Sequence, residues 1–108
     1  LYLMSKYEEA LESINKAIEI NPKDAKVWFN KGNALRDMRR YEEALKSYDE
    51  AIKLNPHFAE AWFIKGFTLY LMGRYEEALK SYDKAIGLNP KDAKVWFNRG
   101  NTLRDMRK

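Results

Sequence analysis

The stretch KDAKVWFNKGNALRDMRRYEEALKSYDEAIKLNP, residues 23–56, decides the fold because a second version of it follows directly at residues 57–90. Residues 1–22 resemble the second half of this unit, and residues 91–108 resemble its first half. Self-similarity with a period of 20–50 residues is typical of arrays of stacked units. The sequence therefore predicts a single array with two full units between two partial ones.

Four landmarks recur at the same spacing of 34 residues. They are an Asn-Pro pair, a tryptophan, a glycine and the segment Tyr-Glu-Glu-Ala-Leu, which starts at Tyr7, Tyr41 and Tyr75. A longer period of 68 residues lies over the first, since residues 22–40 and 90–108 differ at only three positions. This longer repeat indicates that a block of two units was duplicated as a whole.

The pattern inside each unit is helical. Apolar residues such as Leu45, Tyr48 and Ile52 follow the 3.6-residue period of one helix face, and Pro56 interrupts the pattern. Asp24 and Asp92 are expected to cap the helices that follow them, and the Glu-Glu pairs fall in first turns, where the helix dipole favours carboxylates. The expected helices, joined by short connections that make neighbours antiparallel, span residues 6–20, 24–39, 41–54, 58–72, 75–88 and 92–107.

Composition excludes several kinds of chemistry. The 108 residues are 45% hydrophobic and 33% charged, as in a soluble globular protein, and no apolar run is long enough for a membrane span. The chain has no cysteine and a single histidine, His57, in an inter-unit turn, so neither a metal centre nor a catalytic triad is expected. No cofactor is expected, and no targeting segment is visible, so we expect a cytoplasmic protein.

The landmarks resemble those of the tetratricopeptide repeat (TPR), a 34-residue helix-turn-helix unit. The resemblance covers the whole chain and implies an all-α fold, a right-handed α-solenoid of antiparallel helix pairs with six helices. It differs in two landmarks, because the leucine before the glycine is Lys31, Lys65 or Arg99 here, and the tyrosine of the first helix is a leucine, such as Leu35 or Leu69. The residues expected to form the structural core of the repeats are Trp28, Gly32, Ala44, Tyr48, Pro56, Trp62, Gly66, Ala78, Tyr82, Pro90, Trp96 and Gly100.

The resemblance also implies a binding surface, because such solenoids have a concave side lined mainly by the first helix of each unit. Asparagine amides there can pair with a peptide backbone, phenylalanines can take apolar anchors, and basic residues can pair with carboxylates. The residues expected to bind a peptide are Lys26, Phe29, Asn30, Asn33, Arg36, Phe63, Phe67, Tyr70, Lys94, Phe97, Asn98, Asn101 and Arg104.

The sequence thus favours a non-catalytic interaction scaffold that binds an extended, acidic peptide with apolar anchors. Family members that clamp the C-terminal carboxylate of chaperones use five polar positions, of which only Asn33 and Lys94 match here, so that ligand is not predicted. Binding of RNA through the basic and aromatic helices is an alternative, although the net charge is only +4. A third hypothesis makes the chain a substrate-positioning arm of a larger enzyme.

The two ends of the chain predict self-association. The helix near residues 6–20 has no first-helix partner, and the helix near residues 92–107 has no second-helix partner, so both expose apolar surface. Copies are therefore expected to associate head to tail, through a contact that need not close. Domain exchange is the alternative, because the turn at Arg39 lacks the glycine that stands at Gly73 in the next unit.

Overall fold

The computed structural model describes residues 2–107, with side chains from Met4 onward; Leu1 and Lys108, in the two partial units, lie outside the described residues. The described part holds six α-helices and no strand, which confirms the predicted all-α fold. The helices are α1 (Tyr2–Ile20), α2 (Ala25–Asp37), α3 (Tyr41–Leu54), α4 (Ala59–Leu71), α5 (Tyr75–Leu88) and α6 (Ala93–Asp105).

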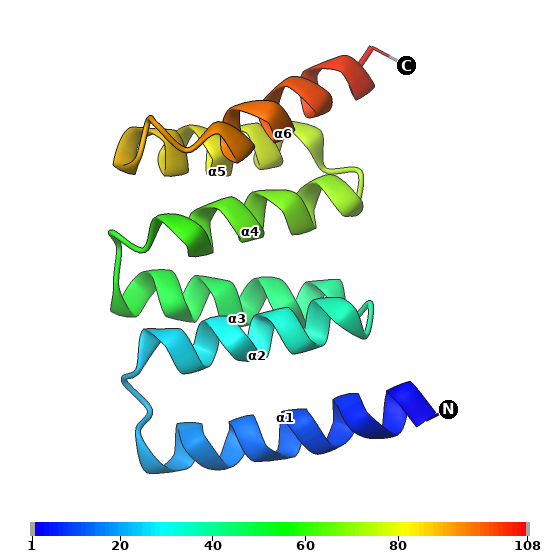
Figure 1. Ribbon diagram of the computed structural model, residues 1–108, viewed down its shortest axis with the longest axis vertical. Helices are drawn as coiled ribbons and strands as arrows, with labels where there is room; N and C mark the ends of the chain where they lie inside the picture. The colour runs from blue at the N-terminus through cyan, green and yellow to red at the C-terminus, as the bar shows by residue number, and fades with distance from the viewer. Residues whose placement is uncertain (1, 108) are drawn as a thin grey trace. The chain divides into compact units, whose positions relative to one another are not determined.

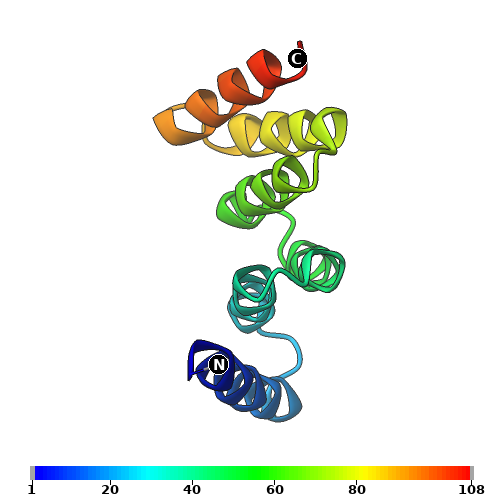
Figure 2. The same ribbon diagram turned by 90° about the vertical axis from the view of Figure 1, so that its right-hand side faces the viewer.

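The helices form two compact units, divided after Pro56. Unit 1 contains α1, α2 and α3, and unit 2 contains α4, α5 and α6. Consecutive helices within each unit run antiparallel and lie side by side, as both ribbon views show (Figure 1, Figure 2). The short connections predicted from the sequence account for this arrangement.

The starts of two helices follow the predicted capping chemistry. The Asp24 carboxylate accepts a hydrogen bond from the Lys26 backbone N–H at 3.0 Å, and the Asp92 carboxylate accepts one from the Lys94 N–H at 3.2 Å. A side-chain acceptor here satisfies one of the N–H groups that a helix leaves unpaired in its first turn. Both predicted N-caps are therefore confirmed.

The starts of α3 and α5 hold an ion pair that the sequence analysis missed. Arg40 binds Glu43 through two hydrogen bonds of 2.8 Å, and Arg74 binds Glu77 through bonds of 2.7 and 2.8 Å. These bonds lower the pKa of both glutamates below the ordinary value. The second glutamate of each pair thus binds an arginine just before the helix, in addition to facing the helix dipole.

One predicted boundary was wrong by four residues. Helix α1 begins at Tyr2 rather than near residue 6, and it continues through Ser5, the position equivalent to Gly73. Gly73 has a φ of 78°, which glycine adopts at little cost, whereas serine favours the right-handed region. At Ser5 the helix continues without a turn.

Helices α2 and α3 are separate in the structure, although no glycine stands between them. Arg39 takes the left-handed conformation, with a φ of 64°, and the Arg40 N–H then donates to the Leu35 carbonyl at 2.8 Å. At the equivalent place Gly73 adopts the same conformation, and Arg74 donates to Leu69 at 2.9 Å. The hydrogen-bonded turn therefore forms at Arg39 despite the steric cost of a left-handed arginine.

The core of unit 1 lies where a glycine of α2 meets a tyrosine of α3, and the core of unit 2 lies where a glycine of α4 meets a tyrosine of α5. Tyr48 and Tyr82 are fully buried, and a methyl group placed on Gly32 would lie 2.5 Å from the Tyr48 ring. At the same position of unit 2, a methyl group on Gly66 would lie 2.8 Å from the Tyr82 ring. Glycine is needed at both places because the ring occupies the volume that any side chain would take.

Candidate functional site

The candidate binding surface of unit 1 is one face of α2. Lys26 and Asn30 are exposed there, while Phe29, Asn33 and Arg36 are half-buried. The Phe29 ring packs against Tyr48 of α3, with 5.8 Å between the ring centroids. The face therefore combines two exposed polar side chains with an aromatic ring that the core supports from behind.

The candidate surface of unit 2 is formed by α4 and α6, which lie in contact. Lys94 of α6 reaches across to α4, where its ammonium lies 3.6 Å from the Glu60 carboxylate and 5.6 Å from the centre of the Phe63 ring. At the other end the Tyr70 hydroxyl donates to the Asp105 carboxylate. That bond raises the pKa of the Tyr70 phenol. Together with the Lys94–Glu60 ion pair, it joins α6 to α4 at both ends of the surface.

Two asparagines of the predicted site are oriented by hydrogen bonds. The Asn33 side-chain oxygen accepts a bond from the Tyr48 hydroxyl at 2.8 Å, so its NH₂ group is turned away from that bond. The Asn98 NH₂ group donates to the Lys94 carbonyl at 2.7 Å, so its side-chain oxygen remains as an acceptor. The two amides thus offer complementary groups, a donor on α2 and an acceptor on α6.

The three phenylalanines at equivalent positions differ in exposure, although the sequence repeat predicts one aromatic series. Phe63 is only 6% exposed because Tyr82 and Lys94 pack on it, whereas Phe97 is 69% exposed and Phe29 is intermediate. Phe67 and Tyr70 of α4 are half-buried and stacked, with 6.3 Å between their centroids. The aromatic surface available to a ligand in unit 2 is therefore provided by Phe67, Tyr70 and Phe97.

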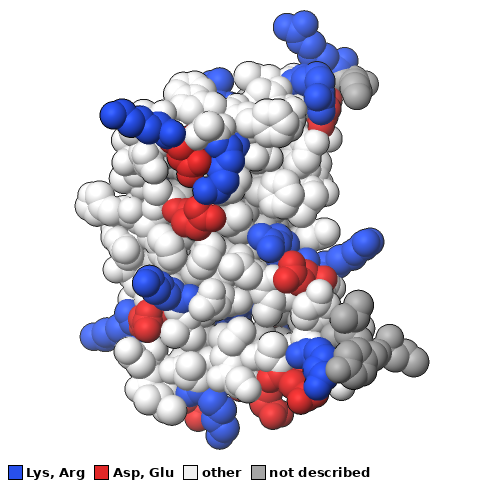
Figure 3. Space-filling view, viewed as in Figure 1, with Lys and Arg blue, Asp and Glu red and all other residues white. Residues whose placement is uncertain are grey.

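Three basic residues of the predicted site are paired with carboxylates. Arg36 lies 3.2 Å from Asp37, Arg104 lies 3.2 Å from Asp105, and Lys94 lies 3.2 Å from Asp92. Figure 3 shows the same mixing over the face in view, where acidic side chains accompany the basic ones. A carboxylate of a ligand can replace the protein's own aspartates as the partner of these basic side chains. The acidic residues between them interrupt the basic surface that a nucleic-acid backbone favours.

The two core tyrosines differ in their polar partners. Tyr48 donates to Asn33, but Phe67 stands at the equivalent place in unit 2, and among the described residues the Tyr82 hydroxyl has no hydrogen-bond partner. The neighbouring Thr102 hydroxyl donates to the Asn98 carbonyl instead. Burial raises the pKa of Tyr82 to about 12. Unit 2 thus holds a buried hydroxyl whose desolvation the neighbouring Thr102 hydroxyl offsets only in part.

Replacing the two tyrosines by phenylalanine should therefore give opposite results. We expect Tyr48→Phe to lower the free energy of unfolding by about 1 kcal/mol, because it removes a hydrogen bond and leaves the Asn33 oxygen unpaired. We expect Tyr82→Phe to leave it unchanged or to raise it, because the buried hydroxyl has no bond to lose. Urea denaturation followed by circular dichroism measures both. Equal losses in the two variants would contradict the difference between the units.

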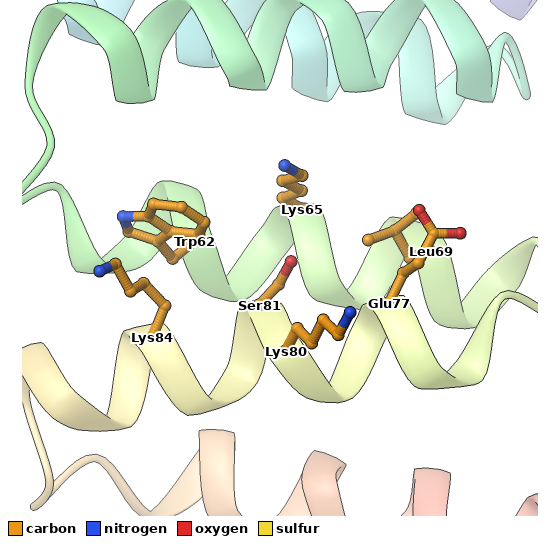
Figure 4. Close-up of a pocket in the computed structure, with 7 residues that line it drawn as sticks. All are labelled: Trp62, Lys65, Leu69, Glu77, Lys80, Ser81 and Lys84. Carbon is orange, nitrogen blue, oxygen red and sulfur yellow. The ribbon is translucent and has the colours of Figure 1, made fainter.

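A groove recurs between the two helices of the pairs α2–α3 and α4–α5. In unit 2 it has a volume of about 260 Å³ (Figure 4) and is lined by Trp62, Lys65, Leu69, Glu77, Lys80, Ser81 and Lys84. Lys65 and Lys84 lie over the Trp62 ring, at 5.5 and 5.8 Å from its centre.

Unit 1 has the equivalent groove, where Lys31 lies 5.4 Å from the centre of the Trp28 ring. The lysine that replaces the usual leucine of the repeat thus covers the tryptophan by a cation–π contact. Because the protein's own lysines occupy these grooves at equivalent positions, we regard them as a product of helix packing.

No cluster of metal-binding side chains occurs among the described residues, and no helix among them has the length and hydropathy needed to span a membrane. His57 is exposed in the connection between α3 and α4, as the sequence suggested.

Comparison with known proteins identifies the repeats. A family model described as "Tetratricopeptide repeat" matches residues 29–93 and 68–105, and one described as "TPR repeat" matches residues 1–38. Comparison of the sequence with curated proteins gives no match.

Two solved structures have the same fold. The first TPR of Spaghetti (RPAP3), bound to the HSP90 peptide SRMEEVD, has a TM-score of 0.90 at 20% identity, over 99% of this chain and 85% of that one. The crystal structure of MamA has a TM-score of 0.86 at 20% identity, over 97% of this chain and 61% of MamA. At these identities the likeness shows the fold alone.

Proposed function

Because this chain belongs to the tetratricopeptide repeat family, whose domains are generally protein–protein interaction modules, we propose that it is a non-catalytic scaffold that binds an extended peptide. The candidate surface for the peptide in unit 1 is the exposed face of α2, and in unit 2 it is the exposed face of α4 and α6. The single observation that carries the proposal is that an amide is oriented within each unit, since Asn33 presents a donor in unit 1 and Asn98 presents an acceptor in unit 2. Peptide backbones supply both complementary groups.

Side chains around the amides set the kind of peptide. Phe97 is exposed beside Asn98, and the stacked rings of Phe67 and Tyr70 lie on the neighbouring helix. These rings favour apolar anchors in the ligand, since partly buried aromatic surface gains most from being covered. Lys26 of α2 and Lys94 of α6 are exposed and favour acidic residues in the ligand.

The carboxylate clamp of chaperone-binding repeats does not explain the ligand. Phe29, Ile64 and Asn98 stand at three of its five positions. The RPAP3 domain was solved with an HSP90 peptide, but that fact describes the relative. We therefore propose an internal peptide segment as the ligand, rather than a C-terminal tail.

The proposal is tested by selecting peptides from a random display library on the 108-residue protein and measuring their affinity by fluorescence anisotropy. We expect the selected peptides to combine apolar anchors with Asp or Glu. Asn30→Ala and Asn98→Ala, which change equivalent positions of α2 and α6, should each weaken binding about two- to ten-fold, the effect of one hydrogen bond of about 0.5–1.5 kcal/mol.

Lys46→Ala and Lys80→Ala are the matched controls, because both lysines are exposed at equivalent positions on α3 and α5. They should leave the affinity unchanged. Peptide binding that is lost in the lysine variants and kept in the asparagine variants would contradict the proposed surface. A salt-sensitive complex with single-stranded RNA, in the absence of any selected peptide, would favour the nucleic-acid alternative instead.

A further inference from the structure

The groove between α4 and α5 differs from the groove between α2 and α3 at a single position. Each groove is lined by seven side chains at equivalent positions of the repeat, and six of the seven are the same residue type in both. The seventh is Lys84 on α5 and Glu50 on α3. Helix packing forms both grooves, since the same tryptophan, leucine and serine line each of them, but it does not determine their charge.

This one difference makes the groove of unit 2 cationic. It is lined by three lysines and one glutamate, whereas the groove of unit 1 is lined by two lysines and two glutamates. The glutamate of unit 2, Glu77, is held mainly by Arg74. Lys65 and Lys80 contribute less to the lowering of its pKa. The groove therefore carries an excess of positive charge that its own carboxylate does not balance.

Lys84 occupies a position where helix packing alone does not favour a lysine. It lies four residues after Lys80 on α5, and two like charges at this spacing destabilise a helix. In unit 1 the equivalent residues, Lys46 and Glu50, have opposite charges. Among the described residues Lys84 has no carboxylate partner, and its ammonium lies 5.8 Å from the centre of the Trp62 ring. An anion that binds in this groove would reduce the repulsion between the lysines.

The three ammonium groups lie at separate places around the groove (Figure 4). Lys84 lies beside Trp62, Lys80 points toward Glu77, and Lys65 projects from the other helix. A single phosphate group needs donors that converge on its oxygens, whereas carboxylates at successive positions of a peptide can pair with cations that lie apart. The methylene groups of such side chains can also cover the exposed part of the tryptophan ring. The arrangement therefore favours several carboxylates over one phosphate.

We propose that the groove between α4 and α5 is a second binding site, which takes an acidic segment of a partner protein in which Glu or Asp residues follow one another. Lys65 and Lys84 bind carboxylates beside the Trp62 ring, and Lys80 binds a further one. The groove of unit 1 rejects such a segment, because Glu50 repels it. The site does not depend on the first-helix proposal, since its residues on α4 lie on a different face from the rings of Phe67 and Tyr70.

Fluorescein-labelled hexaglutamate tests the site, because this peptide carries carboxylates and no apolar anchor. Fluorescence anisotropy at low ionic strength should show one bound peptide per chain, with an affinity that falls as salt is added. Lys84→Glu should weaken binding about five- to thirty-fold, because it replaces one surface attraction by a repulsion. Lys91→Glu is the matched control, since it makes the same change in net charge at an exposed lysine outside the groove, and it should leave the affinity nearly unchanged.

Exchanging the two grooves is the decisive experiment. Glu50→Lys gives unit 1 the same seven lining residue types as unit 2, so this variant should bind two peptides per chain. The double variant Glu50→Lys, Lys84→Glu has the net charge of the wild type and should bind one. In the ¹⁵N-labelled proteins, amide shift changes should concentrate in α4 and α5 of the wild type and in α2 and α3 of the double variant. Circular dichroism verifies that each variant folds, and Lys84→Gln replaces Lys84→Glu if that chain does not.

Several results would overturn the proposal. Hexaglutamate that does not bind at millimolar concentration and low salt excludes the site. Equal weakening in Lys84→Glu and Lys91→Glu would show that net charge alone attracts the peptide. Shift changes that remain in α4 and α5 of the double variant would exclude the role of Lys84. Inorganic phosphate that binds more tightly than hexaglutamate would contradict the choice of separate carboxylates.

A competition experiment separates this proposal from the first-helix proposal. A peptide selected for apolar anchors should not displace hexaglutamate from the wild type, because the two ligands occupy different faces of α4. Displacement would show that both ligands share one surface and would contradict a second site. Loss of hexaglutamate binding in Lys84→Glu, with the selected peptide still bound, supports the groove whatever surface the selected peptide uses.

Discussion

Replacing Tyr48 by alanine should lower the free energy of unfolding by about 3–5 kcal/mol, the loss measured when a large buried aromatic residue is truncated. The ring is fully buried, packs against Phe29 and lies against Gly32, so its removal leaves a cavity lined by residues of two helices. A domain of this size has a total stability of about 5–15 kcal/mol, so the variant should unfold at much lower denaturant concentration. Urea denaturation followed by circular dichroism measures the change.

Ile14→Ala is the control, because Ile14 occupies the equivalent position in α1 and is only half-buried. The loss of unfolding free energy for Ile14→Ala should be less than half that for Tyr48→Ala. A loss for Ile14→Ala as large as that for Tyr48→Ala would contradict the account, because the half-buried position would then contribute as much stability as the fully buried one.

Replacing the glycines by alanine should change the stability of the protein differently at each position, depending on whether another helix packs against the glycine. We expect Gly66→Ala to destabilise the protein by about 1–3 kcal/mol, as overpacking of a filled core does. The new methyl group would lie 2.8 Å from the Tyr82 ring and 3.1 Å from the Ala78 carbonyl oxygen, and a backbone oxygen in a helix does not move aside cheaply. Gly32→Ala should behave in the same way against the Tyr48 ring.

Gly100→Ala is the matched control, since nothing lies within 4 Å of the added methyl group. In dilute solution it should stabilise the protein by up to about 1 kcal/mol, the difference between glycine and alanine in a helix interior. Thermal or urea denaturation of the three variants measures the change in unfolding free energy at each glycine. Similar losses at all three glycines would mean that Gly100 is already packed in the single chain.

Most of the fold could be predicted because it depends on local patterns that repeat. The bounds of α3 and α5 agree with the prediction, and Asp24 and Asp92 cap the helices that they precede. The start of α1 could not be predicted in this way, because the repeat pattern does not show whether Ser5 adopts the left-handed conformation that Arg39 and Gly73 adopt at the equivalent positions. Arg39 turns and Ser5 does not, although neither is glycine.

The site was less predictable, because equivalent residues of a repeat do not have equivalent neighbours. Phe63 and Phe97 hold the same position in the pattern, yet Lys94 and Tyr82 cover only the first of them. In the same way, Phe67 deprives Tyr82 of the acceptor that Asn33 gives Tyr48. The repeat pattern predicts which face a residue occupies, whereas its exposure and its hydrogen bonds depend on side chains from other helices.

The central claim, that the first helices bind the peptide, is tested most directly by nuclear magnetic resonance. The ¹⁵N-labelled wild-type protein is titrated with a peptide that was selected on it. We predict that amide shift changes concentrate in α2, α4 and α6, with the side-chain amides of Asn33 and Asn98 among them. Changes concentrated in α3 and α5, around Lys46 and Lys80, would contradict the claim.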